Sequence, residues 1–159
     1  MLDALVITGG EPTLYGQELT AFCKSFKERF PNKLLKIDTN GSHPKMIEEL
    51  SMVADFCAMD FKAYDYSSFS KIGLSAIQQS LQKIKLFPDF EIRITLFPEY
   101  VHFEAFKKIL NMVKFNKIKK ITLQQYRPLE KNEKTYKKHE IEDWCQQFKD
   151  VLTITYRGF

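Results

Sequence analysis

Short apolar runs alternate along the chain with longer segments in which apolar residues recur every three or four positions. The short runs are rich in β-branched and aromatic residues, as in the run from Leu5 to Thr8, and they predict buried strands. The longer segments have the spacing of amphipathic helices. Strands are predicted at 5–8, 34–38, 55–62, 89–97, 119–125 and 151–156, and helices at 17–30, 44–53, 75–85, 101–114 and 139–149.

The order of these elements indicates an α/β fold. Six strands separated by five helices form repeated βα units, whose crossovers place the strands parallel. A closed eightfold barrel typically takes about 250 residues, whereas this chain has 159. We therefore expect a partial (β/α)6 TIM-like barrel or an open parallel sheet with helices, in a single domain over residues 1–159.

The cysteines and the tryptophan fall on apolar faces, where we expect them to pack in the core. The three cysteines are far apart and form no CxxC pair, which argues against a zinc ribbon or a disulfide framework and favours a reducing cytoplasm. No apolar stretch reaches the about 18 residues that cross a bilayer, so we expect no membrane partner. The residues predicted to face inward include Leu19, Phe22, Cys23, Phe26, Phe30, Cys57, Phe103, Phe106, Trp144 and Cys145.

The formal net charge is +4, and the basic residues gather in two patches, at 114–120 and 131–138. A solvated surface is the first interpretation of these patches, and contact with an acidic partner or nucleic acid is the alternative. We expect no nucleic-acid partner. The charged segment 128–138 has no apparent core residues and is predicted to be an exposed loop. His43 precedes a predicted helix, which favours a cap position over metal binding, and His102 lies at the start of another, where a surface position is favoured.

The candidate chemistry begins where the first strand ends, at Gly9-Gly10-Glu11-Pro12. Two glycines let the backbone adopt positive φ or approach a ligand closely. Glu11 then places a carboxylate at the end of the strand, where parallel α/β folds bind ligands. A phosphate site is a weak alternative, because the segment lacks the lysine of a P-loop and the third glycine of a dinucleotide fingerprint.

Polar side chains also follow or end the other predicted strands, which indicates a ligand site with contributions from several strands. Acids and bases alternate along this set, so we expect a zwitterionic ligand or one of mixed charge. An Asp60–Lys62 surface pair is the alternative for the third strand, since residues two apart share a strand face. The set comprises Glu11, Asp38, Thr39, Asp60, Lys62, Arg93 and the segment from Gln125 to Arg127.

Three segments in this order, VITGGEPTL, KIDTNGSHP and AMDFKA, resemble the radical S-adenosylmethionine (SAM) enzymes. Among these, the chain is most similar to the activating enzymes of glycyl radical enzymes. The nearest likeness is to the anaerobic ribonucleoside-triphosphate reductase activating proteins, with the pyruvate formate-lyase activating enzyme as a relative. The resemblance extends more weakly through IRITLFP and LQQYRP, so it covers essentially the whole chain.

The resemblance implies roles for the strand-end residues. Gly9, Gly10 and Glu11, followed by Pro12, would bind the amino end of SAM. A monovalent cation, Na⁺ or K⁺, would lie beside the SAM carboxylate, since a cation there would offset two converging carboxylates. Its ligands would be Asp38, Thr39, Asp60 and the carbonyl of Ala58. Thr39-Asn40 and Asp60 would also contact the cofactor, Lys62 would lie near the SAM carboxylate and ribose, Arg93 would face the cofactor cavity, and Gln125 with Tyr126 would flank the adenosine.

The resemblance also implies a reaction. In the family, a reduced [4Fe-4S] cluster cleaves SAM to methionine and a 5′-deoxyadenosyl radical, which takes a hydrogen from a glycine of the partner enzyme. The implied partner is an anaerobic ribonucleoside-triphosphate reductase, and the implied reductant is a flavodoxin or a ferredoxin-type protein.

The chain departs from the family at the cluster motif, CxxxCxxC, which precedes GGEP in the family and has no counterpart here. We find no iron–sulfur ligands and no catalytic residue in this chain. We expect a fragment that lacks the first βα unit and is inactive by itself. The first strand present would then have an exposed edge, which would favour dimerisation.

Two other functions stay open. The enzyme 7-carboxy-7-deazaguanine synthase shares a GGEP segment and a TNG turn, although Asp38 and the DFK motif favour an activating enzyme. Neighbouring genes would separate these two possibilities. A non-catalytic domain that binds SAM or a partner protein is the third possibility, and tight SAM binding by this chain alone would favour it.

Overall fold

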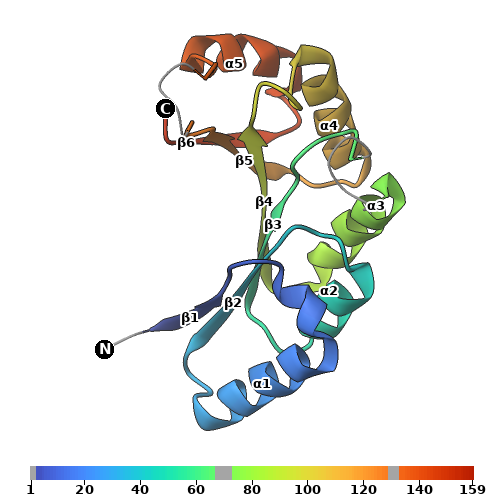
Figure 1. The fold of residues 1–159 in the computed structure, drawn as a ribbon, viewed down its shortest axis with the longest axis vertical. Coiled ribbons are helices and arrows are strands. Elements are labelled where there is room, and N and C mark those ends of the chain that lie inside the picture. Colours follow the sequence, from blue (N-terminus) through green and yellow to red (C-terminus); the bar gives the residue numbers. More distant parts are fainter. Residues whose placement is uncertain (1–2, 67–72, 129–132) are drawn as a thin grey trace. The chain divides into compact units, whose positions relative to one another are not determined.

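The computed structural model describes residues 3–66, 73–128 and 133–159. It contains six strands in the sheet order β1-β2-β3-β4-β5-β6, which confirms the predicted α/β fold (Figure 1). Every pair whose register is described is parallel. The chain divides into two compact units. Unit 1 is Met1–Asp60 with Ser75–Glu91, and unit 2 is Phe61–Leu74 with Ile92–Phe159. Each is considered by itself below.

The elements lie close to their predicted positions. The strands are β1 (Ala4–Ile7), β2 (Leu34–Thr39), β3 (Phe56–Asp60), β4 (Asp89–Leu96), β5 (Lys120–Gln125) and β6 (Thr153–Arg157). The α-helices are α1 (Gly16–Arg29), α2 (Pro44–Leu50), α3 (Leu74–Lys83), α4 (Phe103–Phe115) and α5 (Lys138–Cys145). Three short 3₁₀ helices, which the sequence analysis did not predict, are η1 (Pro12–Tyr15), η2 (Ile84–Leu86) and η3 (Gln146–Phe148).

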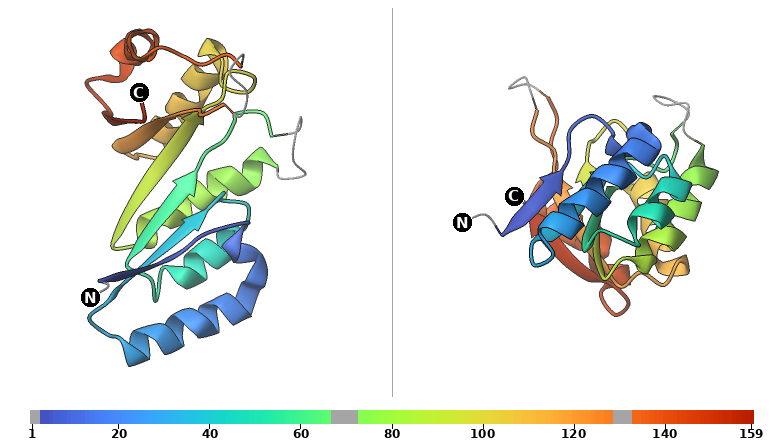
Figure 2. Two further views of the ribbon diagram at one scale, coloured as in Figure 1. Left: turned by 60° about the vertical axis from the view of Figure 1, so that its left-hand side comes forward. Right: turned by 90° about the horizontal axis from the view of Figure 1, so that it is seen from below.

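Unit 1 is built on the parallel strands β1, β2 and β3. Ile7 pairs with Ile37 in register, and Ile37 pairs with Cys57. Alternate residues of β2, namely Leu35, Ile37 and Thr39, are buried, whereas those between them are half-exposed. The side chains of β2 therefore have one covered face and one partly open face. Helices α1 and α2 lie side by side in this unit (Figure 2).

Unit 2 contains the C-terminal part of β4 from Ile92 onward, all of β5 and β6, and helices α4 and α5. Ile92 pairs with Ile121, which pairs with Ile154, so a row of isoleucines crosses the three strands. An aromatic cluster joins α5 to α4, because the ring of Trp144 lies 5.5 Å from that of Phe106. Phe106 is buried in the core of unit 2, whereas Trp144, which was predicted to pack in the core, is half-buried over it.

Helix α1 buries a narrower face than its sequence predicts. Leu19 and Cys23 are buried, as expected, but Phe22 is 54% exposed and Phe30 is 44% exposed. The ring of Phe30 instead contacts that of Phe26, at a centroid distance of 5.4 Å. Both rings, with residues of β1, line an apolar groove of about 200 Å³. The apolar residues of α1 therefore line a surface groove as well as pack in the core.

The segment before α5 is not the fully exposed loop that its charge predicts. Tyr136 is only 8% exposed, and its ring lies 4.8 Å from that of Trp144. Its carbonyl oxygen accepts a hydrogen bond from Nε2 of Gln125, at 2.7 Å. Residues 129–132 of this predicted loop lie outside the described residues, as do residues 67–72.

Strand β1 lies at the edge of the sheet, as predicted. It pairs with β2 and stands at the end of the strand order, and Val6 is 45% exposed. Dimerisation through this edge stays a prediction. Within the described ranges, no helix is long and apolar enough to cross a bilayer.

The buried Cys23 thiol predicts a pH dependence of stability. Burial raises the pKa of Cys23 from its ordinary value of 9.0 to about 11. Between these values the thiol ionises in the unfolded chain but not in the folded one, so the unfolded state binds fewer protons. The stabilisation is therefore complete below pH 9.0 and is lost as the pH rises to about 11. Urea unfolding across this range measures it.

A Cys23→Ala variant is the control for this dependence. Its stability is lower at all pH values because a cavity is created, but the part of the decline that depends on the thiol should disappear. Equal slopes for the two proteins between pH 9.0 and about 11 would contradict the prediction.

Candidate functional site

The loop after β1 exposes its backbone. Gly9 and Gly10 have φ angles of 89° and 52°, in the left-handed region that favours glycine. Both residues are exposed, and a Cβ atom built on either would meet no atom within 4 Å. The peptide groups of this loop are therefore open to a ligand, as the motif predicts.

The Glu11 side chain, by contrast, faces inward. The residue is 9% exposed, and its Oε1 accepts hydrogen bonds from the Thr13 amide, the Thr13 hydroxyl and the Thr39 hydroxyl. Its Oε2 accepts a bond of 2.6 Å from the Asn40 amide. Four donors thus surround one carboxylate, and they join the end of β1 to the end of β2.

His43 extends this cluster. Its Nδ1 lies 3.1 Å from the Thr13 hydroxyl and 2.7 Å from the Ser42 hydroxyl. The residue occupies the N-cap position of α2, as predicted, but its side chain makes no cap hydrogen bond. The His43 ring is therefore joined to the Glu11 cluster through Thr13.

The turn after β2 is held tightly. Gly41 has a φ of 76°, and a Cβ atom on it would lie 2.4 Å from the Cε of Met59. The Asn40 side chain accepts a hydrogen bond from the Ser42 amide, and the Gly41 carbonyl accepts one of 2.6 Å from the Ser80 hydroxyl. A side chain at position 41 would have to displace Met59 and would strain the left-handed backbone. The turn also places the Asn40 amide against Glu11.

Asp38 and Thr39 point to opposite faces of β2. The Asp38 carboxylate is 3.1 Å from the Lys36 ammonium group on the half-exposed face, whereas the Thr39 hydroxyl donates to Glu11 on the buried face. The structure therefore does not bring these two side chains together. Asp60, the third expected cation ligand, ends β3 and is half-buried.

The other predicted site residues belong to unit 2. Lys62 is exposed, and its backbone N–H donates to the Tyr66 hydroxyl at 3.0 Å. Arg93 is half-exposed between buried neighbours in β4, and its carbonyl accepts a bond of 2.8 Å from the Phe61 amide. Gln125, at the end of β5, donates through Nε2 to Tyr136.

Both predicted adenosine neighbours, Gln125 and Tyr126, make polar contacts at the end of β5. The Oε1 of Gln125 is buried and has no hydrogen-bond partner among the described residues. The Tyr126 hydroxyl donates to Glu133, and this bond raises the pKa of Tyr126 above its ordinary value. The buried Gln125 oxygen could accept one more donor from a ligand.

Sequence reasoning missed Thr13 and the role of His43. A weak local signal was present, because an acid followed by proline and threonine is typical of a helix N-terminus. Glu11 is indeed the N-cap of η1, with Pro12 in its first turn. The bonds to Thr39 and Asn40, about thirty residues away, have no local signal.

The comparisons with known proteins begin with sequence. No family model matches the chain. A protein of Methanocaldococcus jannaschii named as a glycyl-radical enzyme activating enzyme is 35% identical over 148 residues, which cover 86% of this chain. The chain spans 60% of the length of that relative.

Two solved structures extend the comparison to the fold. SuiB from Streptococcus suis superposes with a TM-score of 0.67 at 14% identity over 98% of this chain and 39% of SuiB. Archaeal TYW1 superposes with a TM-score of 0.70 at 21% identity over 94% of this chain and 50% of TYW1. The chain has the fold of these proteins. SuiB has been solved with S-adenosylmethionine and with its precursor peptide SuiA.

Proposed function

We propose that this chain forms part of a radical SAM enzyme that activates a glycyl radical enzyme. The observation that carries the proposal is the similarity to the M. jannaschii protein, whose name states that activity. The order of the three motifs at the ends of β1, β2 and β3 supports it, as does the fold shared with SuiB. Because the chain spans 60% of the relative, the activity proposed is that of the whole protein.

The residues after β1 fit the amino end of SAM through their backbone. Gly9 and Gly10 are exposed and carry carbonyl groups that an ammonium group could reach. The Glu11 carboxylate already accepts four hydrogen bonds, so it supports the loop and supplies negative charge behind it. We therefore assign the ammonium contact to the Gly9 and Gly10 peptides and a supporting role to Glu11.

The cysteines of this chain do not fit an iron–sulfur cluster. Cys23, Cys57 and Cys145 are buried and form no disulfide. Within the described residues there is no group of three His, Cys, Asp or Glu side chains that could hold a metal ion. We therefore derive no step through a cluster from these residues. The opposite orientations of Asp38 and Thr39 likewise do not favour the expected Na⁺ or K⁺ site.

The finer assignment concerns the partners. We propose an anaerobic ribonucleoside-triphosphate reductase as the protein substrate and a flavodoxin or ferredoxin-type protein as the reductant. The three motifs, which resemble the reductase activating proteins, support the first of these. The structure of SuiB with its precursor peptide is a precedent, within the same fold, for a polypeptide substrate.

The proposal is tested by titrating SAM into the isotope-labelled chain and following the backbone amide signals by NMR. We expect the signals of Gly9, Gly10 and Glu11 to shift together and to saturate with weak affinity, because their peptide groups face the ligand. Tight binding would instead favour the non-catalytic SAM-binding domain. The amide of Asn116, at the C-cap of α4 in unit 2, is the internal reference. Methionine alone should shift the same three signals, whereas adenosine alone should not.

Two results would contradict these assignments. One is the absence of any shift at Gly9 and Gly10 at SAM concentrations that saturate other amides. The other concerns the cysteines, because anaerobic reconstitution with iron and sulfide should leave this chain without a cluster. Incorporation of about four irons per chain would show that the buried thiols do bind one.

A further inference from the structure

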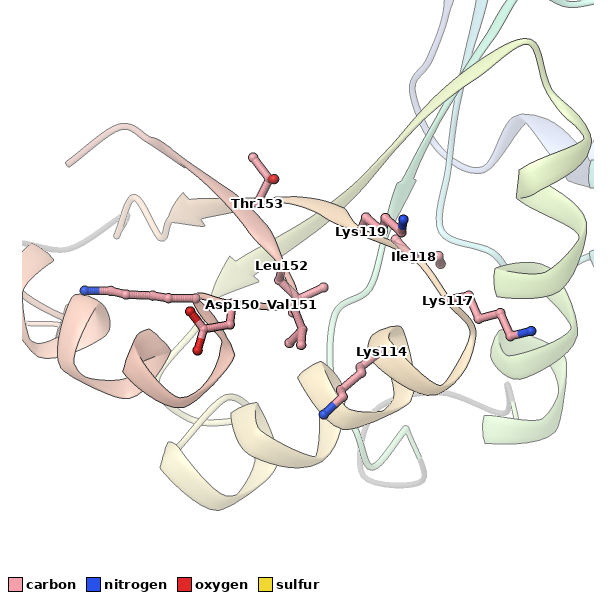
Figure 3. Close-up of a pocket in the computed structure, with 9 residues that line it drawn as sticks. Lys114, Lys117, Ile118, Lys119, Asp150, Val151, Leu152 and Thr153 are labelled. Carbon is pink, nitrogen blue, oxygen red and sulfur yellow. The ribbon is translucent and has the colours of Figure 1, made fainter.

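Unit 2 contains a pocket of about 510 Å³ that is distinct from the strand ends discussed above. It lies at the amino ends of β5 and β6, between the end of α4 and the segment that precedes β6 (Figure 3). Its floor is apolar, with Ile118 and Leu152 buried and Val151 40% exposed. The remaining lining residues are Lys114, Lys117, Lys119, Lys149, Asp150 and Thr153.

The charge around this pocket is strongly one-sided. Four lysines and a single carboxylate, that of Asp150, line it, and all five residues are exposed. None of the four lysines forms an ion pair with a carboxylate of the described ranges. The ammonium groups of Lys114, Lys117 and Lys119 point in different directions in Figure 3. Four ammonium groups outweigh the single carboxylate of Asp150, so the pocket presents a positive potential to an approaching anion.

The backbone at Lys117 provides a second observation. Lys117 has a φ of 59°, and it is the one residue other than glycine with positive φ in the described part of the chain. Its amide donates to the Lys114 carbonyl at 2.9 Å, and the Ile118 amide donates to the Val113 carbonyl at 3.2 Å. These two bonds form a Schellman motif, in which position 117 normally holds glycine.

A lysine at this position has a conformational cost. Left-handed backbone is unfavourable for a residue with a Cβ atom, and such strain is typical of ligand clamps and other functional sites. The helix end itself gains nothing from the lysine, because the two bonds that form it use backbone groups alone. The strained backbone therefore coincides with a charged side chain at the rim of the pocket.

We propose that this pocket, which we call the lysine pocket, is a docking site for an acidic segment of a partner protein. Glutamate or aspartate side chains of that segment would pair with the lysines, and an apolar side chain would cover Val151. The proposal is independent of SAM binding, which involves the other ends of the strands.

The lining residues favour a peptide over a nucleic acid or a simple phosphate. No lining residue of this pocket is aromatic, so bases have no stacking surface. No lining residue is arginine, the side chain that binds phosphate in bidentate fashion. Asp150 would repel a compact phosphate, whereas a peptide can place an apolar or basic group beside it. Exposed lysines are instead typical of salt-dependent association with an acidic protein surface.

The test measures binding of a short fluorescein-labelled peptide of glutamates with a central pair of leucines, by fluorescence anisotropy at low salt. A Lys114→Gln/Lys149→Gln variant should bind the peptide about tenfold more weakly, because it loses two exposed ion pairs that each contribute modestly. The matched control, Lys24→Gln/Lys45→Gln, removes the same charge from exposed positions of unit 1 and should bind nearly as well as the original chain.

A Lys117→Gly variant separates docking from folding. Glycine relieves the left-handed strain, so its urea midpoint should be equal to or higher than that of the original chain. Its affinity for the peptide should nevertheless fall several-fold, and the salt dependence of binding should decrease. A change that raises stability and weakens binding cannot be explained by a purely structural role of Lys117.

Three outcomes would overturn the proposal. They are equal losses of peptide affinity in the pocket variant and the control variant, unchanged affinity in Lys117→Gly, and tighter lysine-dependent binding of oligothymidylate or inorganic phosphate than of the peptide. The last of these would identify the lysine pocket as a nucleic-acid or phosphate site.

Discussion

A Glu11→Ala variant is expected to lose about 3 kcal/mol of unfolding free energy, because the substitution leaves buried donors without an acceptor. The Thr13 and Asn40 amides and the Thr39 hydroxyl all donate to this carboxylate. Because Thr13 and Thr39 are 1% and 3% exposed, water can replace the acceptor only after the loop opens. Urea denaturation followed by far-ultraviolet circular dichroism measures the loss.

A Glu28→Ala variant is the control for this effect. Glu28 is an exposed glutamate of α1, and its replacement should change stability by less than about 0.5 kcal/mol. A Glu11→Gln/Thr39→Val double-mutant cycle should show coupling between the two positions, since the residues are in contact at 2.7 Å. A Glu11→Ala variant as stable as the control would mean that the carboxylate does not join the ends of β1 and β2.

The supporting role of Glu11 also makes a functional distinction. A Glu11→Gln variant keeps the shape of the side chain and one acceptor oxygen for Thr13 and Thr39, but it loses the bond from the Asn40 amide. The loop of Gly9 and Gly10 should therefore largely stay in place. If the glycine peptides contact the SAM ammonium group, this variant should keep most of the SAM-induced shifts. Complete loss of those shifts, with the fold intact, would instead assign the contact to the carboxylate.

The arrangement of strands and helices was largely predictable because its signals are local. A strand or an amphipathic helix has its own periodicity, and α1 differs from its predicted range by one residue at each end. The left-handed glycines after β1 were predictable for the same reason, since glycine is the residue that adopts this conformation without strain.

The polar contacts of the site were not predictable in this way. The motif placed Glu11 after β1. The hydrogen bonds that Thr39 and Asn40 donate to its carboxylate, however, depend on a turn in another βα unit. The family resemblance implies a cation site that includes both Asp38 and Thr39, whose side chains, as neighbours in a strand, point to opposite faces. Proximity along the chain therefore did not imply that these two side chains act together.

The predicted burial of aromatic residues was wrong in both directions, for a related reason. Phe22 has the spacing of a core residue but is 54% exposed, because the buried face of α1 is narrower than its apolar spacing. Tyr136 stands alone in a charged segment, so no periodicity marks it, and its burial depends on Trp144 in the helix that follows. Periodicity identifies a face, but the residues packed against that face decide which of its members are covered.

Because Tyr136 is buried, Tyr136→Ala is expected to lower the unfolding free energy by about 2 to 3 kcal/mol. The ring fills the space beside Trp144, at a centroid distance of 4.8 Å, and holds the segment that accepts the Gln125 bond. Because Trp144 is the one tryptophan of the sequence, its fluorescence should shift to longer wavelength as the ring becomes more hydrated. Tyr136→Phe keeps the ring and should lose under about 1 kcal/mol, with an unchanged emission maximum. Similar losses in the two variants, or an unshifted emission in Tyr136→Ala, would show that the segment before α5 does not pack against the unit 2 core.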